Sequence, residues 1–157
     1  MDLLLAELSD RLAALHQSII KAINGLPDEA LDWSPGPDMN TLSVLLTHTL
    51  GAERFWIGDI AGGEPSGRVR SDEFVATGKS VEDFIERSNN ILAHSQSVVA
   101  RLSIAELDDR RNVPQSDRQV TVAWAVLHAL EHTALHAGHI EITRQLWEQR
   151  HTPHEEE

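Results

Sequence analysis

Apolar residues recur every three or four positions in the first part of the chain, a spacing typical of one side of an amphipathic helix. This pattern predicts a helix from Leu3 to Ile23. Gly25 and Pro27 follow directly and end it, because glycine and proline disfavour a continuing helix. The apolar set is Leu4, Leu5, Leu8, Leu12, Leu15, Ile19 and Ile23.

Two prolines and a glycine within residues 33–40 predict a loop, which is followed by a second apolar pattern. This pattern predicts a helix from Thr41 to Ile60, with Asn40 or Thr41 as its N-cap. Gly62, Gly63 and Pro65 end it. Its apolar positions are Leu42, Leu45, Leu46, Leu50, Phe55 and Ile57.

The polar, glycine-containing segment 65–79 predicts a long connection that crosses one end of the domain. Ser80 has the character of an N-cap, and a third helix is expected from Val81 to about Leu102. A short helical or turn segment at 104–108 and a loop through Pro114 follow. The last helix is predicted from Thr121 to Gln149.

These elements predict an all-α fold, a four-helix bundle with a long crossover connection. No segment alternates with the period of a strand. The length of 157 residues favours one domain, residues 1–150, and residues 151–157 read as a disordered tail.

The amino-acid composition excludes several classes of binding partner and limits the kind of metal site. The net charge of -12 argues against nucleic acid, which requires a basic face. No apolar run approaches the ~20 residues that span a bilayer, and Asp2 and Glu7 replace the basic residues of a secretory signal, so a cytoplasmic protein without a membrane partner is expected. The chain contains no cysteine, which limits a metal site to nitrogen and oxygen donors.

Four histidines follow one another at helical spacings in the last predicted helix: His128, His132, His136 and His139. His132 and His136 are one turn apart on the same side, as in known His-x-x-x-His metal sites. His48, flanked by apolar residues in the second predicted helix, is the expected third ligand. The alternative is that each is a core histidine bonded to a carbonyl or carboxylate, but three buried imidazoles without a common partner leave many polar atoms to satisfy.

Several residues are expected at the edge of this site rather than on the metal. Two carboxylates are considered as orienting partners for the ligands, although a solvated helix face is the favoured interpretation for both. The tryptophans are most simply core or groove fillers, and a pocket wall is the alternative for the two that lie near the histidines in sequence. This set is His128, His139, Glu53, Glu131, Trp56 and Trp124, while solvated side chains are expected for His16, His94, His151 and His154.

Neutral imidazoles suit a divalent ion: Zn²⁺ or Ni²⁺ first, with Fe²⁺ or Mn²⁺ as alternatives. Three protein ligands leave a position open for water or a substrate, which indicates chemistry rather than a structural metal. Because the chain has no cysteine, any thiol must arrive as a small molecule. The catalytic residues themselves cannot be assigned from these positions.

The sequence resembles the DinB/YfiT-like superfamily of DinB-like metal-dependent enzymes. The matching parts are the segment from His48 through Glu53 to Trp56 and the segment from His132 through His136 and Gly138 to Ile140. His139 stands where glutamine is usual in that superfamily, and Leu135 replaces a polar residue or a histidine. The resemblance covers essentially the whole chain.

This resemblance implies a divalent metal held at His48, His132 and His136, and a homodimer. It also implies a range of activities that includes thiol-dependent S-transferases and a mycothiol-dependent maleylpyruvate isomerase. We therefore expect a metal-dependent transferase or hydrolase acting on a small molecule. The competing hypothesis is a non-catalytic bundle that binds a small ligand or a partner, with a structural metal or none.

Overall fold

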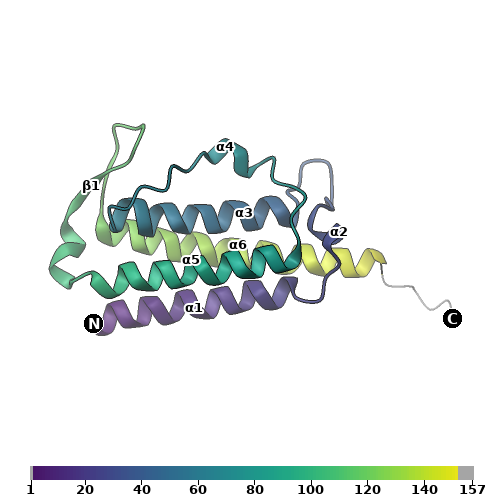
Figure 1. Cartoon of the computed structure of the whole chain (residues 1–157), viewed down its shortest axis with the longest axis horizontal. Coiled ribbons are helices and arrows are strands. Elements are labelled where there is room, and N and C mark those ends of the chain that lie inside the picture. Colours follow the sequence, from purple (N-terminus) through teal and green to yellow (C-terminus); the bar gives the residue numbers. More distant parts are fainter. Residues whose placement is uncertain (1, 152–157) are drawn as a thin grey trace.

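Four long helical segments run alongside one another in the structure, a computed structural model that describes residues 2–151 (Figure 1). This arrangement confirms the predicted all-α four-helix bundle. The segments are α1 (Leu3–Ile23), α3 (Leu42–Glu53) continued by the π-helix η1 (Arg54–Ala61), α5 (Val81–Arg101) and α6 (Val122–His151).

The helices begin where their sequences provide caps. The Thr41 hydroxyl accepts a hydrogen bond from the backbone N–H of Val44 at the start of α3. Ser80 and Asp83 form a reciprocal capping box at the start of α5, which satisfies two backbone donors that a helix leaves open. The bounds of α1 are those predicted, and α6 extends to His151, two residues beyond the predicted end. The remainder of the predicted tail, residues 152–157, lies outside the described residues.

The second bundle helix changes type after Glu53, which the apolar pattern does not predict. It continues through η1 with π-type turns, and the N–H of Gly62 bonds the carbonyl of Ile57 at 2.8 Å. Gly58 lies on this segment in close contact with two side chains, because a Cβ there would displace the Arg54 guanidinium and the His94 ring. Such an inserted turn is frequent at functional sites.

The crossing connection, residues 62–80, leads from the end of η1 back along α3 to the start of α5 (Figure 1). It contains one short helix, α4 (Arg70–Glu73), which packs against α3. The predicted long crossover is therefore present, with a helical turn that its polar sequence does not reveal. A second short helix, α2 (Asp28–Leu31), precedes α3 and was not predicted.

A small hairpin corrects the expectation that the chain has no strand. β1 (Arg110–Asn112) pairs antiparallel with β2 (Gln119–Thr121) directly before α6. Three-residue strands are too short to show an alternating pattern in sequence. The predicted short segment at 104–108 is the 3-10 helix η2 (Ile104–Asp108).

The bundle interior consists of two apolar clusters with a buried polar layer between them. One cluster includes Leu12, Ile57 and Val98, and the other includes Ile19 and Phe84. All four bundle helices contribute fully buried side chains to the polar layer between these clusters. These residues are His16, Glu53, Ser88, Ser95 and Thr133. Among residues 2–151, none of the helices combines the length and hydropathy needed to cross a bilayer.

Candidate metal centre

Three histidines from two helices meet at one point beside the polar layer. His48 comes from α3, and His132 and His136 come from successive turns of α6. Each has a ring nitrogen within 4.8 Å of those of the other two, close enough to share an ion. We call these three residues the histidine triad. The structure thus brings together the residues that the sequence pattern grouped.

The His48 ring is oriented by a carboxylate from the crossing connection. Nδ1 of His48 donates a hydrogen bond to Glu73 at 2.9 Å, and Glu73 accepts two more from Arg68, at 2.6 and 2.8 Å. Burial alone would raise the pKa of Glu73, but the hydrogen bonds from Arg68 and His48 outweigh this effect and lower it. An ionised Glu73 therefore holds the proton of His48 on Nδ1.

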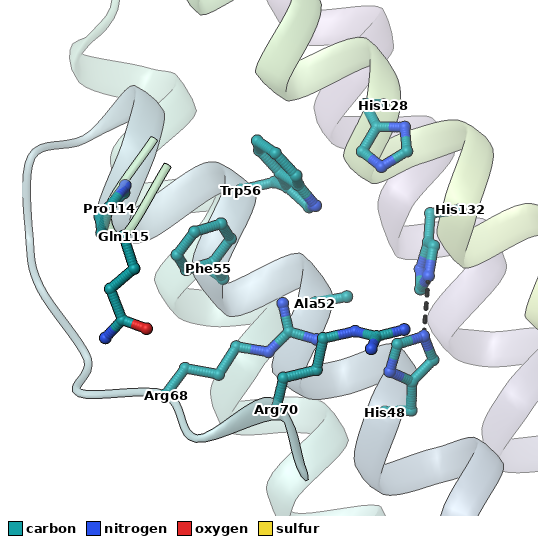
Figure 2. Close-up of a pocket in the computed structure, with 10 residues that line it drawn as sticks. All are labelled: His48, Ala52, Phe55, Trp56, Arg68, Arg70, Pro114, Gln115, His128 and His132. Carbon is teal, nitrogen blue, oxygen red and sulfur yellow. Dashed lines mark hydrogen bonds between the residues drawn. The ribbon is translucent and has the colours of Figure 1, made fainter. Parts of the chain in front are cut away.

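This proton position leaves a lone pair on Nε2 of His48, which lies 3.1 Å from Nε2 of His132 (Figure 2). One of two facing nitrogens must carry the hydrogen, so without an ion His132 donates from its Nε2. Its Nδ1 is then a buried acceptor with no hydrogen-bond partner among the described residues. If His48 and His132 held an ion, neither ring would depend on this shared proton, and the all-nitrogen donor set fits a divalent ion.

Both α6 members of the triad are held in the neutral form. Burial lowers the pKa of His132 to about 3, and the nearby His136 and His48 rings add to the shift. Burial and His48 likewise lower the pKa of His136 to about 4. Neutral imidazole is the metal-binding form, so neither ring has to lose a proton near neutral pH.

A pocket of about 430 Å³ opens directly beside the triad, between α3, η1, α6, the crossing connection and the hairpin turn (Figure 2). His48 and His132 form one of its walls, and Phe55 and Trp56 form another. Trp124 packs edge-to-face behind Trp56 at 5.0 Å rather than lining the pocket itself. An ion held by the triad would therefore face a space that accepts a small molecule.

The two remaining histidines of α6 flank the triad. His128 lines the pocket and stacks on Trp124, with ring centroids 4.5 Å apart. Burial is the main cause of its lowered pKa. His139 is exposed, and its Nδ1 lies 3.2 Å from Nδ1 of His136. The structure thus places both beside the triad, one toward the pocket and one toward solvent.

Glu53 does not orient the triad, and the prediction that its side chain is exposed to solvent is also wrong. The residue is 0% exposed, and its carboxylate accepts hydrogen bonds from Ser95 at 2.7 Å and Thr133 at 3.1 Å. It also pairs with Nε2 of His16 at 2.9 Å, and His16 Nδ1 contacts Ser88. His16, expected in solvent, is therefore buried, because this network satisfies its ring nitrogens.

The other residues singled out in the sequence are either exposed on the surface or partly buried. Glu131 is a solvated carboxylate, 3.9 Å from His128. His94 is not simply solvated, because it contacts Glu64 at 2.7 Å and its Nδ1 is buried. His151 is exposed, as expected, and stacks on Trp147. His154 lies outside the described residues.

Sequence reasoning missed Glu73 and Arg68. Both lie in a polar segment that also contains Glu64 and Asp72, and no periodicity separates the buried carboxylate from its exposed neighbours. One local signal was present in Gly51, one turn after His48 on α3. A Cβ at that position would collide with the Glu73 carboxylate, so the glycine marks a close approach of another segment.

Comparison with known proteins agrees with this arrangement. The sequence model of the family described as Mycothiol-S-transferase matches residues 7–149. None of the curated proteins compared with the chain matches it.

Solved structures share the fold at low sequence identity. A conserved protein from Enterococcus faecalis superposes with a TM-score of 0.77 at 14% identity, covering 93% of this chain and 97% of that one. A DinB-like protein from Bacillus subtilis gives a TM-score of 0.69 at 15% identity, with 93% of each chain covered. At these identities the likeness establishes the helical architecture.

Proposed function

Because this chain belongs to the Mycothiol-S-transferase family and has the DinB-like helical fold, we propose that it is a divalent-metal-dependent enzyme that joins a low-molecular-weight thiol to a small electrophile. The observation that carries the proposal is the position of the histidine triad at the wall of a pocket. A structural metal would be enclosed by its ligands, whereas three ligands beside a cavity leave a position for a reactant.

His48, His132 and His136 would hold the ion. When bound, a divalent ion supplies Lewis acidity that lowers the pKa of a thiol or of water. Zn²⁺ and Ni²⁺ suit three imidazoles best, and Fe²⁺ or Mn²⁺ are the alternatives. The triad gives the ion no negative charge, so a thiolate bound nearby is favoured electrostatically.

The chain's own residues prepare the site. Glu73 and Arg68 fix the His48 ring and keep its Nε2 lone pair directed toward the other two histidines of the triad. Phe55 and Trp56 form an apolar wall that partly excludes water. In the transfer, the thiol loses its proton to solvent, its sulfur forms a bond to the electrophilic carbon, and the leaving group departs with the electrons of the broken bond.

The test begins with the metal content of freshly purified protein by elemental analysis, followed by transfer assays with mycothiol and other cellular thiols against a chloronitroaromatic electrophile. His136→Ala should lose both the stoichiometric metal and the activity. His151→Ala is the matched control, because this exposed histidine lies outside the triad. Full metal content in His136→Ala contradicts the ligand assignment, and turnover by metal-free protein contradicts the mechanism.

Two alternatives give different results in the same assays. A hydrolase would consume an activated ester without any thiol. A non-catalytic ligand-binding bundle would show no turnover with any thiol and would keep its melting temperature in a chelator.

We also propose the homodimer that the resemblance implies. Leu127, Leu135 and Ile142 are exposed along the outer side of α6, each at 47% or more. A second copy covering this side would remove apolar surface from water. Sedimentation should give about twice the monomer mass, and Leu135→Glu should yield a folded monomer. A monomeric unmodified protein contradicts this proposal.

A further inference from the structure

The pocket beside the triad has the opposite charge to the rest of the protein. The chain has 25 acidic and 13 basic residues, yet two arginines and no carboxylate line this pocket. The arginines are Arg68 and Arg70, both from the crossing connection. These two guanidiniums are the charged side chains among the residues that line the pocket, so they determine the charge that a bound molecule meets.

The two arginines differ in how far their charge is already neutralised. Arg68 uses Nε and Nη2 for its two bonds to Glu73. Arg70 forms no ion pair with any carboxylate of residues 2–151, and its guanidinium lies over the Phe74 ring, 4.9 Å from the centroid. Phe74 in turn contacts His48, with ring centroids 5.1 Å apart. Arg70 is thus a cation without an acidic partner in that part of the chain, held close to the triad.

A third cation stands near the hairpin side of the pocket. The Arg118 guanidinium lies 4.1 Å from the Trp124 ring centroid and contributes to the lowered pKa of His128, after burial. Like Arg70, it makes no ion pair within residues 2–151. Arg118 does not line the cavity, so it adds positive potential on the hairpin side without contacting a molecule bound there.

The aromatic part of the pocket wall has a different character. Phe55 and Trp56 present aromatic surface to the cavity, with the Arg68 guanidinium 5.4 Å from the Phe55 ring centroid and the His128 ring 5.0 Å from that of Trp56. A ligand that matches all of these features carries an anionic group attached to a flat apolar body. A guanidinium binds a carboxylate through paired, charge-assisted hydrogen bonds, which favours this anion over a neutral polar group.

We infer that the pocket binds an electrophile that carries a carboxylate, with Arg70 as its anion-binding residue and Trp56 as the wall for its apolar part. This inference rests on the proposed function only in identifying the bound molecule as the electrophile. Arg68 orients His48 through Glu73 and adds positive potential. The contact between the carboxylate and Arg70 thus fixes the orientation of the electrophile in the pocket.

Binding can be measured without metal or thiol, so that a carboxylate cannot bind an ion instead. The probes are 3-phenylpropionate and its uncharged isostere 3-phenylpropionamide, titrated calorimetrically into chelator-treated protein. The carboxylate should bind about tenfold more tightly than the amide, as expected for one charge-assisted contact. Salt should weaken binding of the carboxylate alone.

Variants at Arg70 locate the effect. Arg70→Gln should abolish the preference for the carboxylate, and Arg70→Lys should restore part of it. Arg11→Gln is the matched control, because Arg11 is an exposed arginine of α1 that does not line the pocket. Equal binding of both probes, or an unchanged preference in a folded Arg70→Gln protein, overturns the inference.

A kinetic comparison separates this inference from the proposed function. With metal and thiol present, 4-chloro-3-nitrobenzoate should have a KM about tenfold below that of its methyl ester, and Arg70→Gln should remove the difference. Carboxylate binding without any turnover contradicts the proposed function and leaves the pocket assignment standing. Turnover with equal KM values contradicts the pocket assignment alone.

Discussion

The Glu73 carboxylate lies 2.9 Å from Nδ1 of His48, although 25 positions separate the two residues in sequence. The contact links the crossing connection to the histidine triad. Because an orienting carboxylate fixes both the ring and its tautomer, it should also affect how tightly the triad holds an ion.

Replacing Glu73 with glutamine should weaken metal binding by about tenfold to a hundredfold, because the neutral amide holds the His48 proton less strongly and releases Arg68. The measurement is a competition titration against a chelating dye, with circular dichroism to confirm the helical content. Glu131→Gln is the control, since that exposed carboxylate lies near His128 rather than a triad member. Equal affinities for both variants would refute the orienting function of Glu73.

Gly51→Ala should have a similar effect without touching a polar group. The added methyl would collide with the Glu73 carboxylate and displace it from His48. We expect metal affinity to fall about tenfold. Gly138→Ala provides the comparison, because its Cβ would meet nothing within 4 Å and should stabilise the helix by up to about 1 kcal/mol. An unchanged affinity in Gly51→Ala would show that Glu73 has room to move.

The buried pair of His16 and Glu53 should be essential for stability. Glu53→Ala leaves His16, Ser95 and Thr133 without their shared acceptor, and the expected loss is about 3 kcal/mol of unfolding free energy. Urea denaturation measures it, with Glu131→Ala expected within about 0.5 kcal/mol of the unchanged chain. A loss below about 1 kcal/mol for Glu53→Ala would mean that water or repacking satisfies the layer.

Stability of the metal-free protein should fall as the pH decreases from 7 to 5. His132 and His136 have pKa values of about 3 and 4 in the folded state, whereas unfolded histidines titrate near 6.5. Unfolding therefore takes up protons in this range, and lower pH favours the unfolded state. Urea midpoints should fall less steeply with pH in His132→Gln than in the unchanged chain. Parallel slopes would indicate that the folded ring protonates normally.

The helices and the triad could be predicted because their signals are local. The spacing of His132 and His136 places them on one side of a helix, and the apolar flanks of His48 indicate its burial. Glu73 could not be predicted, because its burial depends on where the crossing connection packs against α3. His16 shows the same difficulty, since its partner Glu53 is 37 positions away and only the assembled bundle joins them.

The crossing connection supplies both the carboxylate that orients His48 and the arginines of the pocket, while the bundle helices supply the three imidazoles. Substitutions in the connection can therefore change what the site accepts without altering the residues that hold an ion. Relatives that keep the triad but differ in this segment should have diverged in substrate preference, and exchanging the segment between two such proteins should transfer that preference with it.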